Sequence, residues 1–297
     1  MSDYPYAAHE TLVAPARRRP ELWRLLAGLA LIAVVTIGLG IVFRGTLATV
    51  FRLRPDLAID LARSNTPGAL LLMLYSYAFV IVAVVVAARM IHDRGLVSLV
   101  GPTDLALRQF GKVIGLLLLV NLAMFLLPPY GGEGELVRNL DTRTWLALLP
   151  LSLGAILVQT ASEELLFRGY LQQALAARFR SPLIWMLVPA LLFGIGHYQP
   201  TAAGDNAWVI VLWTLCFGVI SADLTARAGT LGPAIALHMV NNATALLLVS
   251  LPGPQSGLSL ATLPYGMDDQ QNLSLYLVLD FAFLLIGWLA ARIAIRR

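Results

Sequence analysis

The stretch TWLALLPLSLGAILVQTASEELLFRGYLQQ, residues 144–173, combines a long apolar run with a cluster of charge at its end. Its first 19 residues, Thr144 to Ser162, are almost entirely uncharged and long enough to cross about 30 Å of hydrocarbon as a helix. Glu163, Glu164 and Arg168 follow at once. The stretch therefore predicts a transmembrane helix that carries ionisable side chains near one end.

The composition of the whole chain places it among membrane proteins. Of its 297 residues 58% are hydrophobic and 13% are charged, and the mean hydropathy is +0.76. These values lie outside the range of soluble globular domains. The net charge of +4 comes mainly from arginines scattered between apolar runs, without a basic patch interleaved with aromatics, so no nucleic-acid partner is expected. The lipid bilayer is the expected environment.

Apolar runs predict an all-α fold, a polytopic bundle of about eight transmembrane helices. The two shortest runs are the third and the fifth, which need tilt or extension by neighbouring turns in order to span. The runs are Leu25–Phe43, Pro67–Ala88, Val113–Leu127, Thr144–Ser162, Pro182–His197, Asn206–Ala222, Thr230–Leu251 and Leu273–Ala291.

The distribution of positive charge predicts the orientation of these helices. With both termini in the cytoplasm, most of the 21 Lys and Arg residues fall on the cytoplasmic side, where such residues are retained. The exception is the segment after the first span, where Leu53, Leu57 and Leu61 have the spacing of a short helix lying on the membrane surface. The expected localisation is therefore a multi-pass integral membrane protein.

A few ionisable or amide side chains interrupt the apolar runs, and each is a functional candidate because a charge at membrane depth costs about 2.5 to 3.5 kcal/mol. They are Glu163, Glu164, His197, His238, Asn241, Asn242 and Asp280. Asp280 has no basic residue within a helical turn, and its role is left unassigned.

Helical spacing separates the two glutamates. Glu164 and Arg168 lie four residues apart and are expected to form an ion pair on one helix face. Glu163 is displaced by about 100° around the helix and is free to act. By the same spacing Phe193 shares a face with His197, and His238 shares a face with Asn242, so three helices can bring these groups into one polar pocket.

This set suits hydrolysis by an activated water. Glu163 is the expected base, His197 assists it, and His238 and Asn242 donate to the oxyanion of the tetrahedral intermediate. No cofactor is favoured, but zinc is possible, since Glu163, His197 and His238 are all zinc-ligand types. The only His-Glu pair, His9-Glu10, lacks the second histidine of the metalloprotease signature HExxH.

Three segments resemble the ordered motifs EExxxR, FxxxH and HxxxN of a membrane protease family. They are EELLFRG (163–169), FGIGH (193–197) and LGPAIALHMVNN (231–242). The chain is similar here to the CPBP family, also called the Abi or CAAX protease family, which includes CAAX prenyl endopeptidases and bacteriocin-processing and immunity proteins. The resemblance implies an intramembrane endopeptidase in which Glu163 activates water with His197, His238 and Asn242 stabilise the oxyanion, and Glu164 and Arg168 orient the site. Phe193 is expected to pack in support.

The motifs divide the chain into three parts: N-terminal membrane helices with a basic tail (1–143), a catalytic helix core (144–250), and a C-terminal loop with a final span (251–297). The expected partner is a membrane-associated peptide or protein substrate. Two other classes stay open. One is a non-catalytic immunity or scaffold protein of the same fold, and the other is a proton-coupled transporter that uses Glu163, Asp280 and the histidines as a relay.

Overall fold

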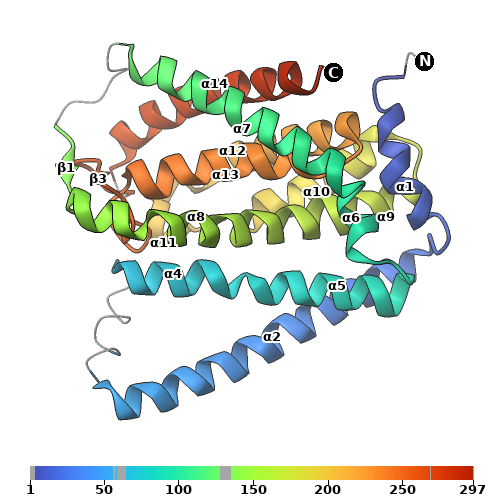
Figure 1. Ribbon diagram of the computed structural model, residues 1–297, viewed down its shortest axis with the longest axis horizontal. Helices are drawn as coiled ribbons and strands as arrows, with labels where there is room; N and C mark the ends of the chain where they lie inside the picture. The colour runs from blue at the N-terminus through green and yellow to red at the C-terminus, as the bar shows by residue number, and fades with distance from the viewer. Residues whose placement is uncertain (1–3, 56–57, 59–64, 128–134, 268, 297) are drawn as a thin grey trace.

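The computed structural model describes residues 4–55, 58, 65–127, 135–267 and 269–296, and the predicted all-α class is confirmed (Figure 1). The elements in chain order are η1 Ala7–His9, α1 Glu10–Ala16, α2 Leu22–Leu53, α4 Pro67–Ser76, α5 Ala78–His92, α6 Leu96–Val100, α7 Thr103–Phe125, β1 Val137–Arg138, α8 Thr142–Glu164, η2 Leu165–Gln172, α9 Gln173–Arg178, α10 Pro182–Ile195, α11 Pro200–Ala203, η3 Gly204–Asn206, α12 Ala207–Ala228, α13 Gly232–Ala243, η4 Thr244–Leu248, β2 Val249–Ser250, β3 Ala261–Thr262 and α14 Gln270–Ile295.

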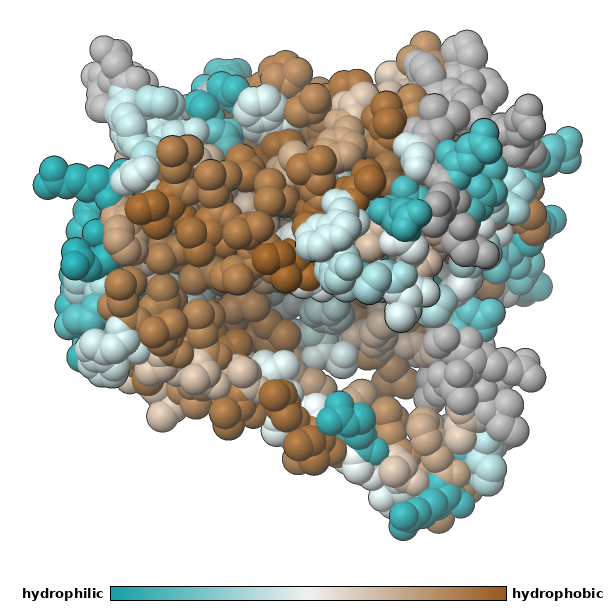
Figure 2. Space-filling view, turned by 180° about the vertical axis from the view of Figure 1, so that it is seen from behind, coloured by the Kyte–Doolittle hydropathy of each residue, from teal (hydrophilic) through white to brown (hydrophobic). Residues whose placement is uncertain are grey.

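Six helical segments of the described chain are long and apolar enough to cross a membrane, which is consistent with a multi-pass integral membrane protein. They are Leu22–Leu53, Pro67–His92, Thr103–Phe125, Thr142–Arg178, Pro200–Ala228 and Gln271–Ile295. The surface of the molecule agrees with this, because Figure 2 shows a broad hydrophobic region across the middle and hydrophilic residues gathered at the two ends.

Two of the eight predicted spans differ from the expectation. The run Pro182–His197 forms α10, which has 14 residues, and the run Thr230–Leu251 forms α13, which has 12 residues. The second run is not one continuous helix, because α13 passes into the π-helical turn η4 and then into strand β2. Hydropathy identifies both runs as apolar but cannot tell a full span from a shorter helix that is packed inside protein.

The two chain ends lie at the same end of the bundle in Figure 1. That placement agrees with an even number of crossings, while the cytoplasmic location of this end stays a prediction. Arg44 and Arg52 lie within α2, which extends beyond the predicted first span to Leu53. Leu57 and Leu61 of the predicted surface helix lie outside the described residues.

Helix α8 runs through the middle of the bundle beside α4, α5 and α13 (Figure 1). It starts at an Asp141 N-cap, whose carboxylate accepts hydrogen bonds from the backbone N–H groups of Arg143 and Thr144 at 3.1 and 3.0 Å. It continues without interruption into the π-helical segment η2 and then α9. The result is a 37-residue helical rod, Thr142–Arg178, that carries the charged cluster in its interior.

Helices α10 and α12, which both contact this rod, pack closely against each other. A Cβ atom on Gly218 of α12 would lie 2.8 Å from both Cα and Cβ of Ala190 in α10. The carbonyl of Gly218 also accepts a hydrogen bond from Arg168 at 3.2 Å. Because of this contact, the spacing of the two helices determines where that carbonyl lies.

Gly218→Ala is therefore expected to lower the thermal unfolding temperature of the purified protein, with a loss of about 1 to 3 kcal/mol typical of overpacking. Gly38→Ala is the matched control, because a Cβ there meets nothing within 4 Å and α2 should gain slightly from alanine. Equal unfolding temperatures for the two variants would contradict the close packing of α10 and α12.

Candidate functional site

Glu164 is anchored at the end of α8 by two partners. Arg168 Nη1 donates to Glu164 Oε1 at 3.0 Å, so the predicted i, i+4 ion pair is confirmed. His238 Nδ1 lies 2.8 Å from the same oxygen and donates to it from α13. The side chains of Glu164 and Arg168 are 0% and 1% exposed. Such a charge-assisted, buried arrangement fixes both partners in one geometry.

The local helix type contributes to this arrangement. The ion pair starts at the last residue of α8 and ends inside η2, where the chain is π-helical. π-Helical turns are rare and occur frequently at functional sites. The guanidinium of Arg168 reaches α12 as well, through its bond to the Gly218 carbonyl, and lies 4.9 Å from the ring centroid of Phe193 in α10. One arginine thus links three helices.

Glu163 points differently from its neighbour. His238 Nε2 lies 3.5 Å from Glu163 Oε2, which places the imidazole between the two carboxylates. Within the described part of the chain, Glu163 Oε2 accepts no hydrogen bond, although the side chain is only 14% exposed. Glu163 is thus a nearly buried carboxylate whose Oε2 has no hydrogen-bond partner in the described chain.

His197 lies just beyond the end of α10, and its Nδ1 donates to the carbonyl of Phe193 at 2.8 Å. That bond leaves Nε2 of the neutral ring as a proton acceptor. The ring centroid of Phe193 lies 4.6 Å from that of His197 and 6.2 Å from that of His238. Phe193 therefore packs between the two histidines. In the described residues no hydrogen bond or ion pair joins His197 directly to Glu163.

Asn242 shares the α13 face with His238 but bonds to α8. Its Nδ2 donates to Gln159 Oε1 at 2.8 Å, and its Oδ1 accepts from Asn241 Nδ2 at 3.2 Å. Gln159 is buried and lies one helical turn before Glu163. Gln159 was not predicted from the sequence, although a glutamine four residues before Glu163 in an apolar run is the signal that identifies it. Phe217, whose ring centroid is 4.8 Å from that of His238, was also missed.

The possible zinc set does not fit the observed geometry. Among the described residues, no group of three or more His, Cys, Asp or Glu side chains is placed to hold a metal ion. Catalytic zinc takes three protein ligands. Here Nε2 of His238 lies 3.5 Å from Glu163 Oε2, but His197 does not join them as a third donor in the described residues.

The fold and these contacts define the class as a polytopic α-helical membrane protein with a buried Glu, His and Arg cluster. Residues 144–244 match the model of the family described as Type II CAAX prenyl endopeptidase Rce1-like. This segment is thus an Rce1-like CAAX protease family domain, as the three motifs predicted.

One curated relative is similar over most of the chain. It is the Uncharacterized protein YyaK of Bacillus subtilis (strain 168), 26% identical over 241 residues, which cover 78% of this chain and 79% of the relative. No solved structure matches the chain significantly.

Proposed function

We propose that this protein is an intramembrane endopeptidase that hydrolyses peptide bonds of membrane-associated proteins or peptides. The observation that carries the proposal is the pair of adjacent glutamates with opposite surroundings. Glu164 Oε1 accepts hydrogen bonds from Arg168 and His238 at 3.0 and 2.8 Å, whereas Glu163 in the described chain has only the longer contact of Oε2 with His238 Nε2, at 3.5 Å. The family match over residues 144–244 supports a CAAX-type protease.

In the proposed reaction, Glu163 takes a proton from a water molecule as that water attacks the carbonyl carbon of the scissile bond. His197 assists, because its Nε2 is left as an acceptor by the bond from Nδ1 to the Phe193 carbonyl. The new C–O bond forms a tetrahedral intermediate with a negative oxygen. The proton held by Glu163 then passes to the departing amine nitrogen as the C–N bond breaks.

The negative oxygen of the intermediate needs hydrogen-bond donors. Asn242 has a second amide hydrogen besides the one given to Gln159, and His238 presents Nε2 on the side of Glu163. For this role His238 must carry a proton on Nε2 as well as on Nδ1, which faces Glu164. Glu164 and Arg168 act by orienting that ring.

The chain divides into N-terminal membrane helices (1–143), a catalytic core (144–250) and a C-terminal loop with a final helix (251–297). The family match to 144–244 supports that assignment. A bacterial plasma membrane is the proposed location, supported by the similarity to a Bacillus subtilis protein. The protein binds and cleaves its substrate within or beside the bilayer.

The direct test is a comparison of membrane proteomes from cells that carry the wild-type protein or the Glu163→Gln variant. A substrate should accumulate uncleaved with the variant and should be cleaved at one bond by purified wild-type protein. If no membrane protein or peptide differs between the two strains, the non-catalytic scaffold class is favoured instead.

Gln159→Leu is expected to lower kcat roughly tenfold with little change in KM, because Asn242 loses its acceptor and its amide is free to rotate. Gln159→Glu keeps an acceptor oxygen at that place and should restore most of the rate. The measurement is steady-state cleavage of the identified substrate.

The control for this prediction is Gln109→Leu, which removes a partly buried amide network, from Gln109 to Ala228 and Thr230, with no hydrogen bond to the cluster in the described residues. It should leave kcat of the folded protein unchanged. A Gln159→Leu variant with wild-type kcat would show that Asn242 needs no positioning from α8.

A further inference from the structure

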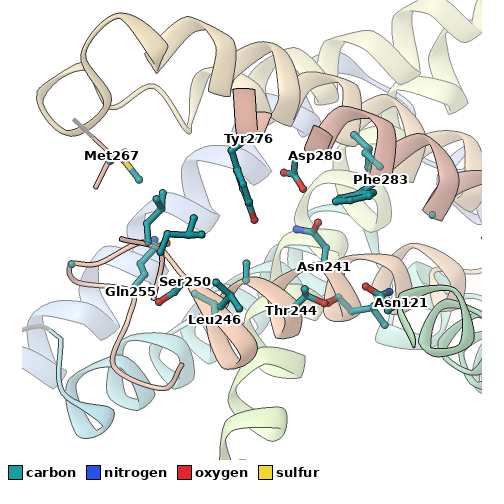
Figure 3. Close-up of a pocket in the computed structure, with 18 of the residues that line it drawn as sticks. Asn121, Asn241, Thr244, Leu246, Ser250, Gln255, Met267, Tyr276, Asp280 and Phe283 are labelled. Atoms are coloured by element: carbon teal, nitrogen blue, oxygen red, sulfur yellow. The ribbon is translucent and has the colours of Figure 1, made fainter. Parts of the chain in front are cut away.

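A second polar cluster lines a cavity of about 390 Å³ on the other side of α13 (Figure 3). Its walls come from α7, α13, η4, the segment 249–255 and α14, and most of the lining is apolar. Figure 3 shows the side chains of Tyr276, Asp280 and Asn241 directed into the same space. The polar residues of the lining include Asn121, Gln199, Asn241, Thr244, Tyr276 and Asp280.

Asp280 is the one acidic side chain of this lining in the described chain, and it is uncompensated. It lies in α14 about 15 Å from the start of the helix, at 1.5 Å per residue, and hence within the span. Within the described residues it makes no hydrogen bond or ion pair, and no Lys or Arg lines the cavity. A carboxylate at this depth favours a cationic guest.

The cavity is connected to the candidate active site by a chain of three amides. Asn241 lines the cavity and donates to Asn242 Oδ1 at 3.2 Å, and Asn242 donates to Gln159 Oε1 at 2.8 Å. Gln159 lies one turn from Glu163 on α8. Adjacent residues of α13 thus contact the two regions, since Asn241 lines the cavity and Asn242 bonds to α8 beside the Glu163 cluster.

The wall of the cavity also has a feature suited to an extended peptide. Val249 and Ser250, which form β2, line it, and the order of the small sheet is β1-β3-β2. In the described part of the chain, β2 thus has a hydrogen-bonded strand on one side only. An edge strand offers backbone N–H and C=O groups to a peptide that adds alongside it. An amine-bearing lipid such as phosphatidylethanolamine lacks the regularly spaced backbone N–H and C=O groups that pair with such a strand.

From these observations we propose that the cavity between α7, α13 and α14 is a substrate subsite that takes a Lys or Arg side chain, flanked by apolar residues, of an extended peptide. Asp280 pairs with the cationic end, and the apolar walls cover the aliphatic stem and its neighbours. This inference rests on the proposed peptidase function and names the substrate class of that site.

The test measures binding rather than cleavage. Full-length Glu163→Gln protein is placed in phosphatidylcholine nanodiscs and titrated with a fluorescent peptide of alternating Leu and Ala that carries one central Lys. A second peptide has norleucine in that place, which keeps the stem and removes the charge. The Lys peptide should bind on the order of tenfold more tightly, equivalent to about 1.4 kcal/mol. Asp280→Asn, added to the same protein, should abolish that preference.

Asp205→Asn is the matched control, because Asp205 is an exposed carboxylate that does not line the cavity, so the Lys preference should persist. Equal binding of the two peptides, no binding of the Lys peptide, or a preference that survives Asp280→Asn would each overturn the proposal. Loss of Lys-peptide binding in phosphatidylethanolamine nanodiscs would assign the cavity to a lipid amine instead. Cleavage plays no part in these readouts, so a failure here is distinct from a failure of the proposed function.

Discussion

Glu163→Gln is expected to reduce peptide-bond cleavage by at least about 10² to 10⁴, the range that a general base contributes. The amide has nearly the shape of the carboxylate but cannot take a proton from water. Oε2 of Glu163 accepts no hydrogen bond within the described chain, so the substitution breaks no hydrogen bond at this atom. It changes one contact, the 3.5 Å approach of His238 Nε2 to that oxygen. The rate is measured on the substrate identified from the membrane proteome.

The control for this prediction separates a chemical loss from a folding loss. Glu135→Gln makes the same change at an exposed carboxylate far along the chain from the cluster and should keep the wild-type rate. Thermal unfolding of the Glu163→Gln protein should stay close to that of the wild type. If Glu163→Gln cleaves at the wild-type rate, Glu163 is not the base, and a role in structure or transport becomes the better account.

The part of the site that sequence spacing could predict is the part within one helix. The pair Glu164 and Arg168 follows from i, i+4 geometry and is present at 3.0 Å. The partner His238 is 74 residues from Glu164, and its position between the two glutamates depends on how α13 packs against α8. The i, i+4 spacing in the sequence predicts that His238 and Asn242 share one helix face. It could not show that the side chain of Asn242 donates a hydrogen bond to Gln159 in α8.

The fold shows the same limit. Apolar runs located the membrane helices, because hydropathy reports which segments avoid water. They did not show that the rod from Thr142 to Arg178 becomes π-helical at Leu165, since the usual period of 3.6 residues assumes one helix type. They also did not show that the run from Thr230 to Leu251 ends in a strand. Both features depend on packing against other helices, which no single segment encodes.

The largest stability effect is expected at Arg168. Arg168→Met keeps a long unbranched side chain but leaves Glu164, which is 0% exposed, without its cationic partner. Removing one member of a buried ion pair costs about 3 to 5 kcal/mol, because the remaining charge is buried uncompensated. The lost bond to the Gly218 carbonyl adds to this, since that carbonyl also lies inside the bundle. The measurement is reversible unfolding of the protein in detergent micelles.

Arg108→Met is the matched control, because Arg108 and Asp104 form an ion pair with the same i, i+4 spacing at 2.8 Å, but their side chains are 64% and 71% exposed. Screening by water limits that pair to about 1 kcal/mol or less. A second variant distinguishes charge from packing: Glu164→Leu combined with Arg168→Met removes both charges and should recover part of the lost stability. If Arg168→Met destabilises no more than Arg108→Met, the buried pair contributes no more to stability than an exposed one, and the anchoring of His238 through Glu164 loses its physical basis.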